Sequence, residues 1–126
     1  MYNPLKYYTQ EALKNMNDKA KEILSFMYPP ITMYEEGGEV KIEADLPGFN
    51  KKDIKIRTDK NSVTIEATRK IQTEGTVIVN QRPEHVFKRV SVPYEIEQNA
   101  DLVAKYADGV LKISLQIKGM KTVKVE

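Results

Sequence analysis

The chain has 126 residues, which is enough for one domain with short extensions and a substantial core. It carries 20 Lys and Arg against 18 Asp and Glu, and this net charge of +2 lacks the basic excess typical of a nucleic-acid-binding protein. The absence of cysteine excludes a disulfide framework and a thiolate metal site. No membrane-spanning apolar run or signal-peptide pattern occurs, so we expect a cytoplasmic protein that does not insert into membranes.

Residues 9–28 are expected to form a helix, which Thr9 can cap and which Pro29-Pro30 ends. Its apolar residues recur at spacings of three and four and therefore share one face. They are Leu13, Met16, Ala20, Ile23, Leu24 and Met27. The arm of residues 1–32 either packs on the following domain as an ordinary helix or serves self-association and the binding of other proteins, because Met and aromatic side chains adapt to many partners.

From Glu39 onward the hydrophobic period changes to two, which predicts β-strands with one buried face. The first of these strands runs from Glu39 to Leu46 and is ended by Pro47-Gly48. Its charged residues alternate with an apolar row made of Val40, Ile42, Ala44 and Leu46. Residues 54–68 show the same alternation on both sides of a turn at Asp59-Lys60-Asn61, and therefore predict a hairpin.

Two later segments also alternate. The segment from Phe87 to Pro93 predicts a strand, and its apolar positions are Phe87, Val90 and Val92. The segment from Leu102 to Lys118 predicts a hairpin around Asp108-Gly109, because Gly109 can take positive φ without a Cβ clash. Six or seven short strands without helices between them indicate an all-β, immunoglobulin-like sandwich.

Two motifs carry a resemblance to a known family. The spacing of Ala104 and Asp108-Gly109-Val110-Leu111 resembles the motif near the end of the α-crystallin domain of small heat-shock proteins. The stretches ADLPGFNKKDIKI (residues 44–56) and NSVTIEA (residues 61–67) resemble the first half of that domain. The resemblance implies an archaeal or bacterial type of small heat-shock protein, with an α-crystallin domain over residues 33–118 and a C-terminal extension over residues 119–126.

The connection from Lys70 to His85 is sixteen residues long, which is unusual for a loop without a function of its own. It contains the apolar run Thr76, Val77, Ile78 and Val79. The resemblance implies that this run crosses to a second subunit and pairs with the strand edge near Ile31 to Tyr34, which makes a dimer. The alternative is an unpaired surface loop.

The resemblance also implies a basic residue near the dimer interface, and Lys88 or Arg89 would take that place. Lys88 stands where the family often has an arginine, and this departure weakens the expectation of a specific ion pair. Solvated surface charge is the alternative for either residue, since exposed ion pairs contribute little to stability.

The C-terminal Val123-Lys124-Val125 corresponds, by resemblance, to the I-x-I or I-x-V motif with which these proteins fill a groove on a neighbouring subunit. Val123 and Val125 face the same way in an extended chain and can enter adjacent pockets. Each valine lacks about one methylene, worth roughly 0.8 kcal/mol, so we expect docking about ten-fold weaker or more. The groove residues that the resemblance implies are Ile54, Ile56, Leu102 and Ala104. The alternative is a frayed terminus.

No catalytic constellation occurs, because the single histidine, His85, has no cysteine or G-x-S-x-G nucleophile to accompany it and no P-loop is present. We therefore expect no enzyme, no cofactor and no metal site.

The resemblance implies an ATP-independent holdase that binds partly unfolded client proteins and assembles from dimers into larger homo-oligomers, through its tail and arm. The alternative is a monomeric co-chaperone of the CS-domain class, which would lack the long loop and the tail. A secreted immunoglobulin-like module would more often carry disulfides.

Overall fold

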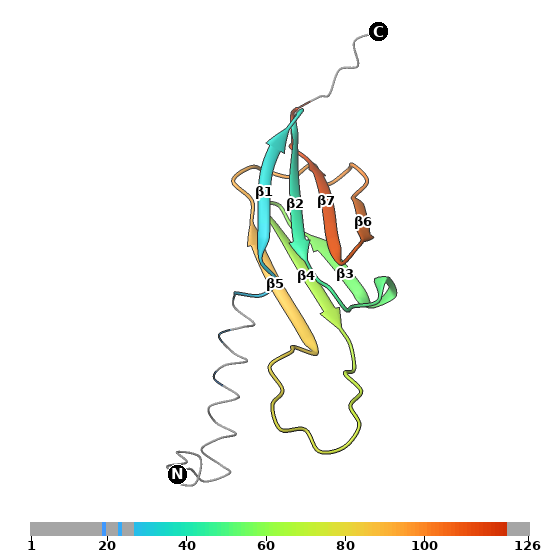
Figure 1. The fold of residues 1–126 in the computed structure, drawn as a ribbon. Helices are drawn as coiled ribbons and strands as arrows, with labels where there is room; N and C mark the ends of the chain where they lie inside the picture. Colours follow the sequence, from blue (N-terminus) through green and yellow to red (C-terminus); the bar gives the residue numbers. More distant parts are fainter. Residues whose placement is uncertain (1–18, 20–22, 24–26, 121–126) are drawn as a thin grey trace.

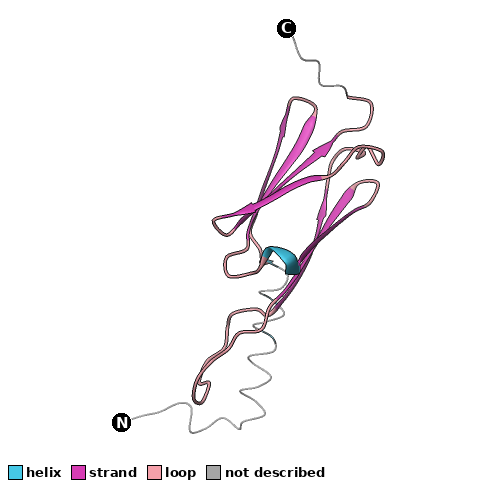
Figure 2. Ribbon diagram, turned by 90° about the vertical axis from the view of Figure 1, so that its right-hand side faces the viewer, coloured by secondary structure: helices cyan, strands magenta, loops and turns pink. Residues whose placement is uncertain are grey.

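The computed structural model describes residues 19, 23 and 27–120. These residues form two antiparallel sheets packed face to face (Figures 1 and 2). The strands are β1 (Ile31–Glu36), β2 (Glu39–Asp45), β3 (Ile54–Thr58), β4 (Ser62–Thr68), β5 (His85–Ser91), β6 (Val103–Ala107) and β7 (Val110–Gln116), with the 3-10 turn η2 (Lys51–Asp53) before β3. One sheet has the order β1-β2-β7-β6 and the other the order β3-β4-β5. The predicted all-β sandwich is confirmed.

The alternation in the sequence explains how the two sheets face each other. Residues directly opposite in an antiparallel pair share one face of the sheet. In the four-stranded sheet, Ile42 pairs with Ile113 and Ala44 with Leu111, and all four side chains are buried. In the three-stranded sheet, β4 supplies Val63, Ile65 and Ala67, each with no exposed surface. These inward rows meet and form one core between the sheets.

Strand β5 differs from the prediction. Its inward row is Val86, Lys88 and Val90, because Val86 pairs with Ala67 and Val90 with Val63 on β4. Phe87, one of the apolar positions of the predicted strand, lies on the outer face opposite Glu66 and is 50% exposed. A period of two that includes Val90 cannot also include Phe87. Val92 is buried as predicted, although it follows the end of the strand.

The segment that follows β5 closes one end of the sandwich. The amide of Val92 donates to the carbonyl of Asn61 and the amide of Ile96 to the carbonyl of Lys60, both at 2.8 Å. One residue later, the amide of Glu97 donates to the carbonyl of Gln116 in the other sheet, also at 2.8 Å. The chain therefore crosses from one sheet to the other here, and Ile96 is buried beneath the crossing.

The predicted turn between β6 and β7 is confirmed. Asp108 has φ of 54° and Gly109 has φ of 76°, the pair of positive values that a tight two-residue hairpin turn needs. The carbonyl of Gly109 accepts a 2.7 Å hydrogen bond from the amide of Leu46, and the hydroxyl of Tyr106 donates to the carbonyl of Leu46 at 2.5 Å. The hairpin is thereby fastened to the end of β2.

We expect Gly109→Ala to lower the free energy of unfolding by about 2 kcal/mol, because an alanine there is strained at positive φ and crowds the neighbouring turn. Its Cβ would lie 3.1 Å from the Cα and Cβ of Pro47. Gly37→Ala is the matched control, since Gly37 has φ of +60° and no atom within 4 Å of the added Cβ. Urea unfolding followed by circular dichroism compares the two at one protein concentration. Equal losses of stability would show that the contact with Pro47 has no effect.

Most of the predicted helix of residues 9–28 lies outside the described residues. This applies to four residues of its apolar face, Leu13, Met16, Ala20 and Leu24. The two that are described, Ile23 and Met27, are 61% and 65% exposed, so their side chains do not join the core of the sandwich. The described chain enters the sandwich at Pro29, which is fully buried.

Candidate functional site

Three of the four predicted groove residues lie on edge strands at the same side of the sandwich, Ile54 and Ile56 on β3 and Ala104 on β6, and Leu102 directly precedes β6. Strand β3 is an edge of the three-stranded sheet and β6 is an edge of the four-stranded sheet, and Figure 1 shows them on the right-hand side of the molecule. Ile54 and Ile56 pair with the buried Ala67 and Ile65, so both point inward. They are half-buried and pack against the core.

Strand β6 and the residue before it carry the other two predicted groove residues. Ala104 pairs with the buried Ile113 and therefore faces inward, and Leu102 follows the same alternation two residues earlier. Nevertheless Ala104 is exposed and Leu102 is 39% exposed, because β6 is an edge strand and no described strand lies beyond it. The four residues thus line an open side of the sandwich, where apolar side chains face inward but remain reachable from solvent.

The sequence analysis did not name one residue that lies beside the predicted groove residues. Thr58 pairs with the buried Val63 and faces inward on β3, in line with Ile54 and Ile56. It lines a shallow depression together with Leu102, Ser114 and Leu115, at the end of the groove next to the crossing segment. The alternation that selected Ile54 and Ile56 also includes Thr58, and only its polar type kept it out of the apolar row.

The opposite side of the sandwich carries the other predicted interface. Strand β1 pairs with β2 alone, so the backbone groups along its second edge have no strand partner within the described chain. The run from Thr76 to Val79 forms no strand there and lies on the long loop of residues 69–84, beyond the ends of β4 and β5 (Figure 1). Val77, Ile78 and Val79 are 52%, 92% and 66% exposed. A free strand edge and an exposed β-branched run therefore occur in one subunit without meeting.

Lys88 and Arg89 have different surroundings. Lys88 pairs with the buried Ile65, faces the inner side of the sheet and is half-buried. Arg89 points outward, and its guanidinium lies 3.9 Å from the carboxylate of Asp59 with both side chains well exposed. An inward-facing lysine on an edge strand hinders unwanted pairing with other sheets.

The remaining polar contacts are superficial. The ion pairs of the described residues have N to O distances of 3.4 to 3.9 Å, and each has at least one well-exposed partner, so each contributes little to stability. At the end of β1, the hydroxyl of Tyr94 donates a 2.6 Å hydrogen bond to the carboxylate of Glu35, which raises the pKa of Tyr94.

Among the described residues, no cluster of histidine, aspartate and glutamate could hold a metal ion. No described helix has the length and apolar character that a membrane span needs.

A comparison with known protein families agrees with this sandwich fold. Residues 32–125 match the family described as Hsp20/alpha crystallin. The chain belongs to the Hsp20/alpha crystallin family. The match spans the described sandwich and continues into the tail that carries Val123 and Val125.

Proteins similar to this chain occur in several bacteria. The chain is 33% identical over 89 residues to the 18 kDa antigen of Mycobacterium leprae, a match that covers 70% of this chain and 60% of that protein. It is 28% identical over 97 residues to a heat shock protein of Streptococcus thermophilus, which covers 73% of this chain and 68% of the relative. The chain therefore spans about 60% of the length of the Mycobacterium leprae relative.

Solved structures of small heat-shock proteins share the fold. A mutant of hsp14.1 from Sulfolobus solfataricus P2 superimposes with a TM-score of 0.75 and 40% identity, over 80% of this chain and 84% of that one. A small heat-shock protein from Xylella fastidiosa superimposes with a TM-score of 0.60 and 26% identity, over 78% of this chain and 93% of that one. The sandwich of this chain is therefore an α-crystallin domain, and its relatives include archaeal and bacterial proteins.

Proposed function

We propose that this chain is an ATP-independent chaperone of the cytoplasm, a holdase that binds partly unfolded proteins and prevents their aggregation. The observation that carries the proposal is the match of residues 32–125 to the Hsp20/alpha crystallin family. The sandwich adds physical support, since it presents incompletely covered apolar side chains at Leu102, Val77 and Ile78. Apolar surface of this kind binds unfolded chains without requiring a nucleotide or a catalytic group.

The proposed assembly begins with a dimer. The run from Thr76 to Val79 of one subunit adds to the free edge of β1 in its partner, and the reciprocal exchange completes a two-fold interface. The addition would pair the open backbone groups of β1 and cover the β-branched side chains of the loop, which are exposed in the single chain. Lys88 lies on β5, at the same side of the sandwich as β1 in Figure 1, and we place it near this interface.

Dimers then join through the tail. Val123 and Val125, which lie outside the described residues, dock in the groove formed by Ile54 and Ile56 on one wall and Leu102 and Ala104 on the other. The arm of residues 1–32 adds further contacts and offers Met-rich apolar surface to clients. Heating favours the dissociated state, in which groove and arm are exposed, because each contact contributes only a few kcal/mol.

The test is suppression of aggregation. We expect the purified chain to keep a heat-unfolded enzyme soluble at about equal subunit concentrations and without ATP, as measured by light scattering. A chain with no effect on scattering at any ratio would contradict the holdase. A monomeric mass at all temperatures, together with binding to a folded partner only, would favour the CS-domain type of co-chaperone.

Replacing Val123→Ile and Val125→Ile together is expected to slow the exchange of subunits between assemblies about ten-fold. Each added methylene contributes roughly 0.8 kcal/mol when it is buried in the groove. Fluorescence energy transfer between differently labelled assemblies measures the exchange rate. Lys124→Ile is the control, because residue 124 faces away from the groove if the valines face into it. Exchange as fast in the double variant as in the parent chain would contradict docking through these valines.

A further inference from the structure

The long loop of residues 69–84 is closed at its base by two hydrogen bonds to Glu84, one to its backbone carbonyl and one to its side chain. The amide of Arg69 donates to the carbonyl of Glu84 at 2.8 Å, and the amide of Ile71 reaches the carboxylate of Glu84 at 3.4 Å. Beyond this base, residues 72–79 are all exposed. The exposed part of the loop therefore projects from a closed neck at the ends of β4 and β5.

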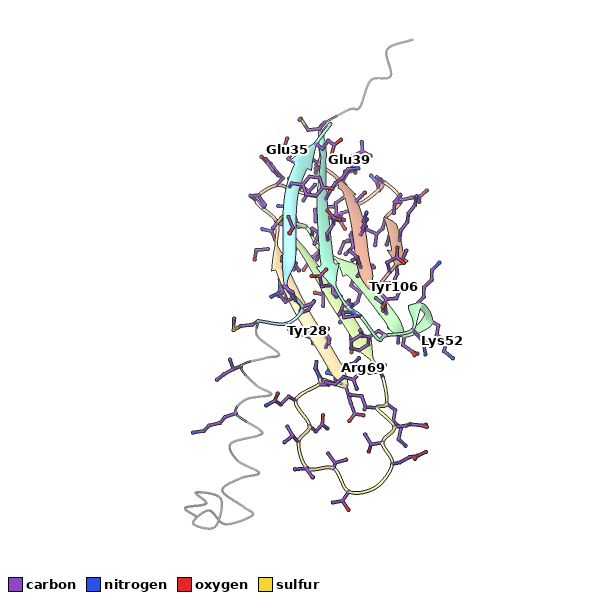
Figure 3. All side chains as sticks on the ribbon, in the orientation of Figure 1. Tyr28, Glu35, Glu39, Lys52, Arg69 and Tyr106 are labelled. Carbon is purple, nitrogen blue, oxygen red and sulfur yellow. The ribbon has the colours of Figure 1, made fainter. Side chains whose placement is uncertain are left out.

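The side chain of Arg69 ties this neck to a third segment. Its Nε donates to the carbonyl of Pro83 at 2.9 Å, and its Nη1 donates to the carbonyl of Pro47 at 3.3 Å. The guanidinium carbon lies 4.3 Å from the centre of the Phe49 ring, which is itself buried in the core. Figure 3 shows Arg69 where the loop leaves the sandwich. One side chain thus joins both ends of the loop to the turn that follows β2.

The turn after β2 is shaped to admit this guanidinium. Gly48 has φ of +88°, and a Cβ at that position would lie 2.5 Å from Nη1 of Arg69. A side chain at position 48 would therefore require the guanidinium to move from its present place beside the carbonyl of Pro47. A lysine at position 69 could not replace it, because a single ammonium cannot serve two carbonyls on different segments while lying flat on an aromatic ring.

We propose that Arg69 is a positioning residue for dimer assembly, which fixes the neck of the loop against the Pro47-Gly48 turn so that Thr76 to Val79 leave the sandwich in one direction toward a second copy of the chain. This inference rests on the proposed strand exchange. A loop with a fixed neck has less conformational freedom to lose when its strand docks, so the dimer forms more readily. Without the guanidinium, the neck opens and the same strand searches a larger volume.

The experiment compares Arg69→Gln with Arg57→Gln in the full chain. Arg57 is the control because it is an exposed arginine on β3, paired at 3.9 Å with Glu66 and remote from the loop. Hydrogen exchange of the assembled protein reports on each segment separately. We expect the amides of residues 76–79 to exchange about ten-fold faster in Arg69→Gln, with β2 and β7 unchanged, and subunit exchange to accelerate by a similar factor. Arg57→Gln is expected to behave as the parent chain.

Three results would overturn the proposal or its basis, and they are distinguishable. Fast exchange at residues 76–79 in the parent assembly would contradict the strand exchange itself. Protection of residues 76–79 in the parent chain and equally in Arg69→Gln would overturn only the role of Arg69. Faster exchange in β2 and β7 as well would show that Arg69 stabilises the whole domain rather than positioning the loop.

If Arg69→Gln does not fold, Arg69→Lys replaces it as the test variant, because it keeps a cation near Phe49. Exchange about three-fold faster at residues 76–79 supports the proposal, and parental rates refute it.

Discussion

Truncation after Lys118 is expected to reduce the assembled protein to dimers. The removed segment carries Val123 and Val125, the two side chains proposed to dock in the groove of a neighbouring subunit. Two buried valines contribute roughly 3 kcal/mol, which corresponds to about a hundred-fold in affinity. Loss of this contribution at micromolar subunit concentration separates the dimers, while the edge of β1, far from the groove, keeps each dimer intact. Light scattering after size-exclusion chromatography gives the mass directly.

Substitutions within the tail test whether the two valines alone cause this effect. Val123→Ser with Val125→Ser is expected to match the truncation, since both apolar contacts are lost. Lys124→Ser is expected to leave the mass unchanged, because alternate residues of an extended chain point in opposite directions. A truncated protein with the mass of the full assembly would show that the tail does not link dimers.

Replacement of the apolar run from Thr76 to Val79 is expected to have a second large effect, the conversion of dimers to monomers. The variant combines Thr76→Gly, Val77→Ser, Ile78→Gly and Val79→Ser at constant loop length. It removes three β-branched apolar side chains, each contributing about 1 kcal/mol when half-buried, and it lowers the strand propensity of the run. The dimer dissociation constant is therefore expected to rise at least a hundred-fold. Sedimentation of the chain truncated after Lys118 measures dimer and monomer without larger species.

A polar variant of the same loop is the matched control. Gln72→Ser, Thr73→Gly and Glu74→Ser alter exposed residues next to the strand and make the loop equally flexible, but they leave residues 76–79 intact. These changes are expected to shift the dimer dissociation constant by no more than a few-fold. Equal dissociation in both variants would mean that loop flexibility, and not the apolar run, governs the dimer. A dimer that persists in the first variant would exclude exchange through this segment.

Local patterns predicted much of the sandwich from the sequence. The period of two placed Ile42, Ala44 and Ile65 in the core, and Asp108-Gly109 marked the hairpin turn, because both features depend on neighbouring residues alone. On β5, apolar type alone did not show that the buried row contains Val86 and Val90 and excludes Phe87. Its true partner is Glu66 on the outer face, and this pairing depends on the register between two strands that a long loop separates.

The candidate site was predictable only in part, for a related reason. Alternation shows that Ile54 and Ile56 share a face, but it does not show that β3 is an edge strand, which follows from the order of strands in the sheet. The role of the groove and of Thr76 to Val79 came from family resemblance. The contacts of Arg69 with Pro47 and Phe49 join residues about twenty positions apart, and no local pattern indicates such a meeting.

The order of the four-stranded sheet has a further consequence for the size of the assembly. Strands β1 and β6 are its two outer edges, so the surface proposed for the dimer and the surface proposed for the tail lie on opposite flanks. In the proposed assembly, occupying one flank leaves the other free, so each subunit would have two independent contact surfaces. The dimer contact would close on itself by two-fold symmetry, whereas the tail contact would run from donor to acceptor and could continue from dimer to dimer. The angle at which the tail leaves Gly119 would then determine whether the proposed particle closes into a shell or adds further dimers.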